Sequence, residues 1–474
     1  MAGDNLLLIS FITNDCRTIG TCSLYANATE AGINAKLLYI KSDVPLNVEA
    51  IKLFLRQNKF AYVGVSLATH EFYISIELTR IIKEALPEVF IIWGGIHPTC
   101  MPEECLQVVD CLCIGESEKV LIDLIRTHSL GQDISVLQGV ATRNNDKTVI
   151  NQAGFVSDIN SIHFPYYDFD NFFVSDMNSN YVRNFSLEEY ARYSRHGGDG
   201  YTLITMRSCP HNCSYCINSY LNKLYKGKGK IRRRTVGKAM EEIKFAIDRI
   251  PSIRFINFMD DHFLTSTKWL NEFCDVYASE IQLPFIIRST PEALTEARLV
   301  NLKKAGLAVV QVGIQSGSEE THRTIFNRHF NRRRILEAAN LLNKYKIKGM
   351  FDFIIGNEFE SDYQKEQTIR LMMDLPKPFI ANIFHIIVFP KTDIVDFYKK
   401  NNITPRINPY HTNYNDFNNN DFFAKLALLV PHINNDLVEN FLESRSDTNI
   451  IDRLDAELRN IQNNHSIMFS EYDV

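Results

Sequence analysis

The stretch RSCPHNCSYC, residues 207–216, decides how this sequence is interpreted. It places three cysteines, Cys209, Cys213 and Cys216, four and three residues apart, directly after an apolar segment. A structural zinc site needs four ligands, and no nearby CxxC or HxxxH pair completes one, although His211 carries a nitrogen donor. Three thiolates on one loop instead fit a 4Fe–4S cube in which cysteines hold three irons and the fourth iron stays open.

The composition excludes several classes of protein. The chain has 474 residues, enough for about three domains, and 45% of them are hydrophobic. The net charge is only −5, which argues against a protein that coats nucleic acid. No apolar run reaches the ~18–20 residues of a membrane span, and the N-terminus lacks a signal pattern. We therefore expect a soluble, cytoplasmic monomer that binds neither nucleic acid nor membrane and keeps its ten cysteines reduced.

Residues 1–145 alternate short apolar runs with amphipathic stretches. The runs are nearly continuous rather than alternating, which is typical of parallel strands buried on both faces. We predict a doubly wound, Rossmann-like α/β domain here. Its predicted strands are Leu6–Ile12, Lys36–Ile40, Tyr62–Leu67, Phe90–Trp93 and Cys111–Ile114.

A second βα series follows a polar, aromatic-rich stretch, residues 146–200, that we interpret as a linker. Residues 201–398 hold six strand-like runs separated by helical segments, which predicts a partial, TIM-like (β/α)6 barrel. Residues 399–474 read as a small, mainly helical C-terminal region. The six predicted strands are Leu203–Arg207, Arg254–Met259, Phe285–Arg288, Val309–Ile314, Met350–Ile355 and Ile383–Phe389.

Polar residues follow these predicted barrel strands repeatedly. Chemistry in barrels takes place at the carboxyl ends of the strands, so a candidate site forms where these residues converge. No side chain stands out as a general acid or base, and the catalytic residues stay unknown. The polar residues at the strand ends are Asp260, Asp261, Ser289, Gln315, Ser316 and Asn357.

With an aromatic residue at Tyr215, the cysteine motif CxxxCxΦC resembles the signature of the radical S-adenosylmethionine (SAM) superfamily. The resemblance implies that Cys209, Cys213 and Cys216 hold a 4Fe–4S cluster. It also implies that the amino and carboxylate groups of SAM chelate the open iron. One-electron cleavage then yields a 5′-deoxyadenosyl radical.

Three further stretches resemble superfamily motifs. FMDDHF (258–263) is similar to a second-strand motif, GIQSGS (313–318) to GIESGS, and GNEFES (356–361) to GxPGET. The resemblance implies SAM contacts by the strand-end residues named above. Gln315 departs from the usual Glu, and Asp260-Asp261 have a structural alternative as a cap of the following helix.

The N-terminal domain resembles the cobalamin-binding domain of one large class of radical SAM enzymes, on the run GGIHPT (94–99) and on GESE (115–118). The resemblance implies that Ser66, Gly94 and Gly95 lie at the cobalamin site. Where cobalt-ligating domains carry DxHxxG, residues 15–20 read DxRxxG with Arg17, and a guanidinium cannot donate a lone pair to a metal. We therefore expect a lower cobalt face without histidine and assign His97 no cobalt role. The alternative is a domain that keeps its shape without the cofactor.

The resemblance implies a cobalamin-dependent radical SAM enzyme that methylates an unactivated centre of a small molecule or natural-product intermediate. Such enzymes take electrons from a donor such as flavodoxin or ferredoxin. Related alternatives are a cyclase or rearrangement enzyme, a methylthiotransferase acting on RNA, and a non-catalytic corrinoid-binding protein. A basic stretch between Lys223 and Arg234 is interpreted first as a salt-bridged surface and second as a docking site for an anionic partner.

Overall fold

The structure is a computed structural model that describes residues 5–13, 15, 16, 18–144, 147–194, 197–226, 231–329, 331–411 and 421–464. It divides into two compact units. The first comprises Met1–Tyr201, Leu224–Ile253 and Pro409–Asn413. The second comprises Thr202–Lys223, Arg254–Asn408 and Tyr414–Val474.

The first unit is built on a nine-stranded sheet with the order β7-β6-β5-β4-β3-β1-β2-β8-β9. The inner strands pair in parallel, and their order 2-1-3-4-5 is that of a doubly wound fold of the flavodoxin type. The predicted Rossmann-like domain and its five strands are thereby confirmed. These strands are β1 (Leu6–Ile12), β2 (Ala35–Lys41), β3 (Tyr62–Ser66), β4 (Phe90–Gly94) and β5 (Cys111–Cys113).

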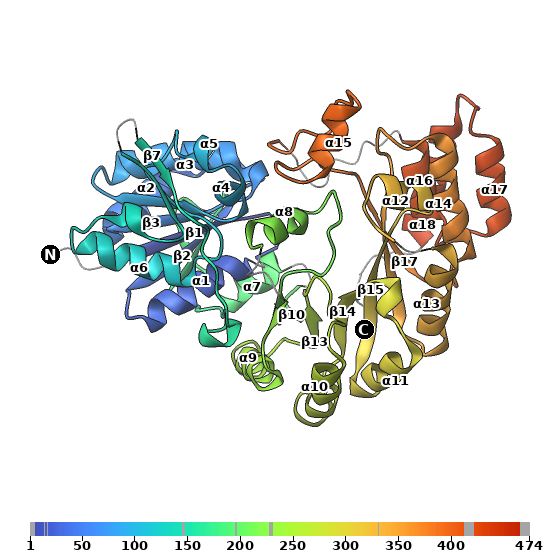
Figure 1. Ribbon diagram of the computed structural model, residues 1–474, viewed down its shortest axis with the longest axis horizontal. Helices are drawn as coiled ribbons and strands as arrows, with labels where there is room; N and C mark the ends of the chain where they lie inside the picture. Colours follow the sequence, from blue (N-terminus) through green and yellow to red (C-terminus); the bar gives the residue numbers. More distant parts are fainter. Residues whose placement is uncertain are drawn as a thin grey trace. The chain divides into compact units, whose positions relative to one another are not determined.

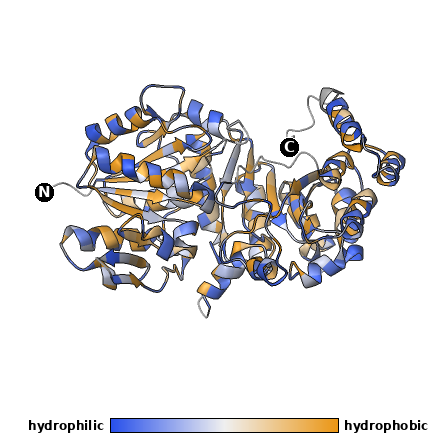
Figure 2. Cartoon of the chain, turned by 90° about the horizontal axis from the view of Figure 1, so that it is seen from above, coloured by the Kyte–Doolittle hydropathy of each residue, from blue (hydrophilic) through white to orange (hydrophobic). Residues whose placement is uncertain are grey.

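Helices cover both faces of this sheet. In Figure 1, α2 (Val48–Asn58) and α3 (Phe72–Ala85) lie on one side, and α1 (Ile19–Glu30) and α6 (Glu118–Ser129) lie on the other. β1 is buried at every position, and β2, β3 and β4 are buried except near their ends. Figure 2 shows the same pattern, with apolar strands and helices whose polar sides face outward.

The segment predicted to be a linker extends this sheet instead. β8 (Phe172–Ser175) pairs in parallel with β2, and β9 (Arg183–Asn184) pairs antiparallel with β8. At the opposite edge, β6 (Val140–Asn144) and β7 (Lys147–Ile150) form an antiparallel hairpin. β8 has only four residues and shows no alternation of polar and apolar side chains, so the sequence pattern did not predict a strand there.

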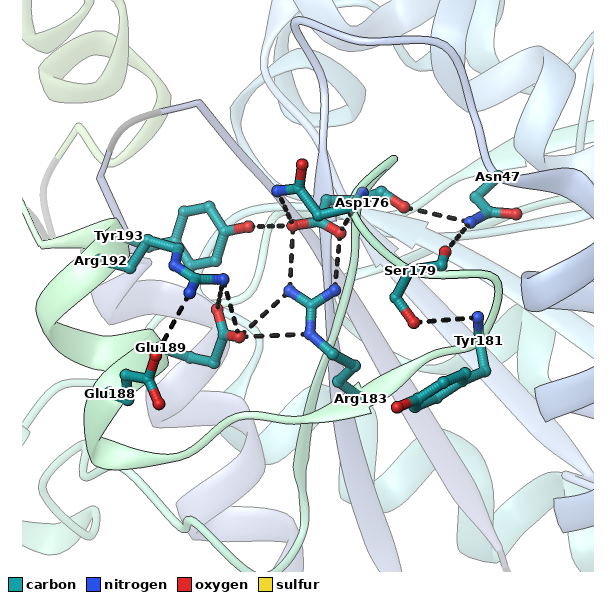
Figure 3. A network of polar contacts seen from close by, with 10 residues as sticks. Asn47, Asp176, Ser179, Tyr181, Arg183, Glu188, Glu189, Arg192 and Tyr193 are labelled. Atoms are coloured by element: carbon teal, nitrogen blue, oxygen red, sulfur yellow. Dashed lines mark hydrogen bonds and ion pairs between the residues drawn. The ribbon is translucent and has the colours of Figure 1, made fainter.

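An ion-pair network fixes the loop after β8 (Figure 3). The guanidinium of Arg183 donates to both carboxylate oxygens of Asp176, at 2.8 and 3.0 Å, and to Glu189 at 3.2 Å. Hydrogen bonding from Arg183 holds the pKa of Asp176 well below its usual range. Asn47, which caps α2, donates to the carbonyls of Asp176 and Ser179, at 3.1 and 2.6 Å, so this loop is tied to the helical layer.

A short C-terminal segment also belongs to the first unit. The hydroxyl of Tyr410 donates to Glu104 at 2.9 Å, and its ring packs against Phe72 and His97. The imidazole of His411 stacks on Tyr73 with 5.0 Å between ring centroids.

The second unit is built on a six-stranded sheet in the order β10-β13-β14-β15-β16-β17, with parallel pairing from β13 to β17. This confirms the predicted partial barrel, and Figure 1 shows α11 (Glu296–Ala305) and α13 (Arg332–Lys344) outside its strands. The strands are β10 (Gly200–Leu203), β13 (Phe255–Phe258), β14 (Phe285–Ser289), β15 (Leu307–Gln315), β16 (Lys348–Ile354) and β17 (Ile380–Phe384).

Two predicted strands are displaced in the structure. The run predicted as one strand over Leu203–Arg207 is split into β10 and β11 (Met206–Arg207), with Thr205 between them. The chain breaks there because a buried carboxylate, Asp260, takes the backbone N–H groups of Thr205 and Met206. The last strand begins at Ile380, three residues before its predicted start.

The described part of the C-terminal region is mainly helical, as predicted. α16 (Phe422–Leu429) packs against α14 (Asp362–Asp374) and β17, and α18 (Ile450–Asn464) packs against α16. α17 (Asn435–Glu443) lies between α16 and α18 in the chain. Among the described helices, none combines the length and the hydropathy that a membrane crossing requires.

Candidate functional site

The three cysteines lie on the loop between β11 and α8 (Ile217–Leu224). Cys213 is buried, and Cys209 and Cys216 are part-exposed. Burial, together with the neighbouring Asp261 carboxylate and the other thiols, raises the pKa of Cys209 to about 12 and that of Cys216 to about 11. A raised pKa favours the protonated thiol at Cys209 and Cys216, and the positive charge of bound iron would favour the thiolate instead.

The donor set fits a cluster better than a single ion. Within the described ranges, no three His, Cys, Asp or Glu side chains gather closely enough to ligate one metal ion. A 4Fe–4S cube takes each thiolate on a different iron, so its ligands need not converge on one point. The three thiols nevertheless lie close enough for Cys213 and Cys216 to raise the pKa of Cys209.

Hydrogen bonds hold the loop in place. The side-chain amide of Asn222 donates to the carbonyl of Cys209 at 3.1 Å and to Asn212 Oδ1 at 2.9 Å. Ser214 donates from its backbone N–H to the carbonyl of Phe326 at 3.1 Å, and Asn327 donates to the carbonyl of Asn212 at 2.8 Å. The residues after α12 (Glu319–Thr324) thus form one wall of the cysteine loop.

Arg328 makes the most direct contact with the cysteines. Its Nη1 lies 3.7 Å from Cys213 Sγ and donates to the Tyr215 hydroxyl at 3.1 Å. Its Nη2 donates to the carbonyl of Gly313 in β15 at 2.8 Å. The sequence pattern missed this residue because nothing distinguishes it from the other arginines between Arg323 and Arg334.

The two aspartates after β13 occupy different environments. Asp260 is fully buried and accepts hydrogen bonds from the backbone N–H of Thr205 at 2.6 Å and of Met206 at 2.9 Å. It therefore orients the entry to the cysteine loop. Asp261 is exposed and accepts a hydrogen bond from Asn218 at 2.9 Å. Its carboxylate helps to raise the pKa of the Cys209 and Cys216 thiols.

Ser289 and Gln315 lie where β14 and β15 end. Ser289 is buried and donates to the carbonyl of Thr290 at 3.2 Å. Gln315 has a positive φ of 76° at a register shift in β15. Its side-chain amide folds over Gly313, where an added Cβ would lie 2.7 Å from Gln315 Nε2, so the glycine leaves room for it.

The structure brings Ser316 and Asn357 together through Glu360. Ser316 Oγ donates to Glu360 Oε1 at 2.8 Å, and Asn357 Nδ2 donates to Glu360 Oε2 at 2.7 Å. All three side chains are buried. Gly317 fits tightly beside α14, since an added Cβ would lie 2.4 Å from the carbonyl oxygen of Gln367.

A row of four hydrogen-bonded polar side chains, the polar tier, crosses the six-stranded sheet, and no sequence motif predicts it. Arg288 donates to Gln311 at 3.0 Å, Gln311 donates to Asp352 at 3.0 and 2.9 Å, and Asn382 donates to Asp352 at 2.9 Å. Each residue comes two positions after a member of an apolar layer, so both layers lie on one face of the sheet. That apolar layer contains Ile286, Val309, Met350 and Ile380.

The four residues of this tier are part-exposed, although they lie in the middle of strands. Interiors of closed barrels are normally filled by branched apolar side chains. Burial raises the pKa of Asp352 to about 6. These four residues could have been predicted from the sequence, because each is a polar residue inside an otherwise apolar strand.

In the first unit, Ser66, Gly94 and Gly95 meet at the carboxyl ends of β3 and β4. Ser66 pairs with Gly94, and Gly95 has φ +97°. An added Cβ at Gly95 would lie 2.8 Å from the Leu67 carbonyl oxygen and 3.2 Å from Ser66 Oγ. This edge adjoins β1, where the strand order of the sheet reverses. Doubly wound folds bind their ligands at that point.

Two further sequence predictions concern this unit. Arg17 lies outside the described residues. His97 is fully buried, its Nδ1 is 3.2 Å from Thr69 Oγ1, and burial lowers its pKa to about 4. Cys16 and Cys22 are buried, and neither forms a disulfide in the structure.

Described members of the basic stretch engage in ion pairs. Arg232 is buried and pairs with Glu116 through two hydrogen bonds of 2.7 Å, and Arg234 pairs with buried Glu242. Lys223 pairs with Asp393 at 2.5 Å. These pairs favour the salt-bridged interpretation over a docking surface.

Two family models match this chain. Residues 203–372 match the model of the Radical SAM superfamily, and residues 6–125 match that of the B12 binding domain. The first range contains the three cysteines, and the second contains Ser66, Gly94 and Gly95. The predicted pairing of domains is confirmed, and with it the expected cofactor set of a 4Fe–4S cluster, SAM and cobalamin.

Curated relatives include a methyltransferase and cyclases. The uncharacterized methyltransferase PH0819 of Pyrococcus horikoshii is 24% identical over 73% of this chain and 71% of its own length. The anaerobic magnesium-protoporphyrin IX monomethyl ester cyclase of Cereibacter sphaeroides is 23% identical over 75% of this chain. The match spans only 57% of that cyclase.

Solved structures share the fold. The radical SAM methyltransferase TsrM from Kitasatospora setae superposes with a TM-score of 0.67 at 15% identity, over 83% of this chain and 76% of that one. The cobalamin-dependent SAM radical enzyme OxsB superposes with a TM-score of 0.68 at 13% identity, over 98% of this chain and 76% of that one. The agreement extends over both units of the fold.

Proposed function

The chain is a radical SAM enzyme with a B12-binding domain, and we propose that it methylates an unactivated centre of a small molecule. The observation that carries the proposal is the pairing, in one chain, of the cysteine loop with the glycine-lined edge of a doubly wound sheet. When bound, the cluster supplies the electron that cleaves SAM, and cobalamin carries the methyl group.

The protein's own residues bind and orient in this proposal. Cys209, Cys213 and Cys216 hold three irons, and Arg328 fixes the loop against β15. Asp261, Ser289, Gln315, Ser316 and Asn357 are proposed to line the SAM site at the strand ends. Asp260 acts by positioning the loop entry, since its carboxylate is taken up by Thr205 and Met206.

The cobalamin site is proposed at the carboxyl edge of the first sheet. The absence of side chains at Gly94 and Gly95 lets a planar ligand approach the backbone, and Ser66 offers a hydroxyl beside them. Arg17 belongs to this proposal through its motif, because it replaces the histidine of DxHxxG and a guanidinium would not ligate cobalt.

Methyl-labelled SAM tests the reaction. In an anaerobic turnover with methyl-deuterated SAM, a strong reductant and candidate substrates, each labelled product should accompany one 5′-deoxyadenosine and one S-adenosylhomocysteine. Mass spectrometry measures all three. Substrate consumption with 5′-deoxyadenosine but without label in the product would overturn methylation.

A cyclase is the second candidate, and the likeness to the magnesium-protoporphyrin cyclases favours it. The same experiment separates the two functions. Cyclisation forms a product without the labelled methyl group and without S-adenosylhomocysteine.

We also propose that the protein is a cytoplasmic monomer that takes electrons from a flavodoxin or ferredoxin. Light scattering tests the mass of the particle. SAM cleavage with reduced flavodoxin in place of dithionite tests the donor.

A further inference from the structure

A cavity in the second unit is lined by none of the three cysteines and by none of the residues proposed to bind SAM. It has a volume of about 450 Å³, within the usual range of small-molecule sites. Its walls come from α14, from α16 and its N-cap Asp421, from Arg406 and from the turn after α17. The cavity is lined by Asp362, Lys365, Arg406, Asp421, Phe422, Phe423, Arg445 and Ser446.

Lys365 is the unusual member of this set. Only 9% of the residue is exposed, and its ammonium group has neither a hydrogen bond nor an ion pair with any residue that the structure describes. Lys425 is the comparison within the same region, since it is 7% exposed and pairs with Asp455. The stem of Lys365 is therefore buried while its ammonium group faces the cavity, where it is available to an anion that enters.

Two arginines add positive charge to the cavity. Arg406 is held loosely, with Nη1 3.9 Å from Asp421 Oδ2 and Nε 4.0 Å from Glu358 Oε1. Arg445 donates to Glu366 at 2.9 Å and keeps 44% of its side chain exposed. Asp421 is already engaged, because its Oδ1 accepts from the backbone N–H of Ala424 and caps α16.

One wall of the cavity is apolar. The rings of Phe422 and Phe423 meet edge to face with centroids 5.1 Å apart. Three cations against two lining carboxylates, with an aromatic wall beside them, suit a ligand that joins a doubly charged anion to an apolar group.

We propose that this cavity binds an organic phosphate, with the phosphate on Lys365 and the apolar part against Phe422. Arg406 also donates to the carbonyl of Gly356 at 3.4 Å, so the cavity adjoins the loop at the carboxyl end of β16. The site does not depend on the cluster or on cobalamin, and its test is therefore separate from that of the reaction.

Calorimetry with phenyl phosphate as the probe tests the site in the full-length protein, at fixed ionic strength in phosphate-free buffer. We expect a Kd below about 1 mM for the native protein and at least tenfold weaker binding for Lys365→Met. Arg333→Gln is the matched control, since Arg333 is 88% exposed on α13 and pairs only at the surface with Glu337. It should bind the probe as the native protein does.

Thermal unfolding provides a second measurement. Phenyl phosphate should raise the Tm of the native protein but not that of Lys365→Met, because ligand binding stabilises only a protein that binds it. Without ligand, Lys365→Met should unfold at about the temperature of the native protein, since methionine keeps the buried apolar stem that Lys365 packs there. If that variant fails to fold, Arg445→Gln takes its place and should weaken binding about threefold.

Three results would overturn the proposal. They are no binding by the native protein at 5 mM probe (about five times the expected Kd), equal affinity of the native protein and the cavity variant, and tighter binding of benzoate than of phenyl phosphate. The last result would assign the cavity to a carboxylate.

Discussion

The guanidinium of Arg328 lies 3.7 Å from the sulfur of Cys213 and at the same time bonds to the carbonyl of Gly313. A fixed cation therefore stands beside one proposed cluster ligand, and the strand that carries Gly313 holds it there. Hydrogen bonds and charge at the sulfurs are among the factors that set the potential of an iron–sulfur cluster.

Replacing Arg328 by Met should lower the reduction potential of the cluster. The cation favours the more negative, reduced state, and its loss removes that preference. EPR-monitored redox titration without SAM measures the midpoint and separates this effect from SAM binding. Arg323→Gln, an exposed site on α12, is the control. An unchanged midpoint with full iron content would contradict the role of Arg328.

The cluster should depend on the set of three thiols at Cys209, Cys213 and Cys216. Replacing all three by Ala should remove the brown colour and nearly all of the roughly four irons expected per chain. Cys274→Ala should keep both, because Cys274 is a buried residue of the separate helix α10 (Thr267–Glu280). Iron analysis and visible absorbance decide the matter, and cluster absorbance retained in the triple variant would refute the assignment.

Asp260→Ala should destabilise the second unit far more than Asp261→Asn. The first change leaves the buried N–H groups of Thr205 and Met206 unpaired, at a cost of about 2–4 kcal/mol. Asp261 is exposed, so its replacement should cost less than about 0.5 kcal/mol. Urea unfolding of the two variants gives the comparison, and equal losses would argue against a structural role for Asp260.

The carboxyl of Asp352 should make stability depend on pH. Its pKa is raised to about 6 by burial, above the value of about 3.9 in an unfolded chain, so the fold favours the protonated form. That contribution is complete below pH ~4 and is lost as the pH rises through 6. Between pH 5 and 8, the native protein should lose about 1 kcal/mol of unfolding free energy relative to Asp352→Asn. A constant difference across this range would show that the pKa of Asp352 is not raised.

Cobalamin bound to the protein should lack a histidine on its lower face, because Arg17 stands where cobalt-ligating domains have histidine. EPR of the cob(II)alamin form should show no splitting by a protein nitrogen. A clear nitrogen triplet would contradict this expectation. Failure to bind cobalamin at all would favour the alternative of a domain that keeps only the shape.

Local patterns were sufficient for most of the fold. β1 matches its predicted bounds residue for residue, because a continuous apolar run has few other ways to be buried. β10 was misplaced because its end depends on Asp260, which lies more than fifty residues away. β8 escaped notice because four apolar residues among aromatics carry no period.

The candidate site was predictable to the extent that single motifs carry it. The cysteine spacing is a local property, and the family match confirms its meaning. Arg328 and Glu360 act through contacts with residues distant in sequence, such as Cys213 and Ser316. No motif around them signals those contacts, and only the folded chain reveals them.

The first unit is assembled from three separate stretches of the chain, the last of which contributes Tyr410 and its bond to Glu104. No fragment made by a single truncation therefore contains this unit alone and complete. A fragment ending near residue 145 would lack β8 and β9, and a longer one ending at 253 would still lack Tyr410. Moving the B12-binding domain between enzymes of this architecture consequently requires more than exchanging one exon-like block, and chimeras should be built by transplanting all three stretches together.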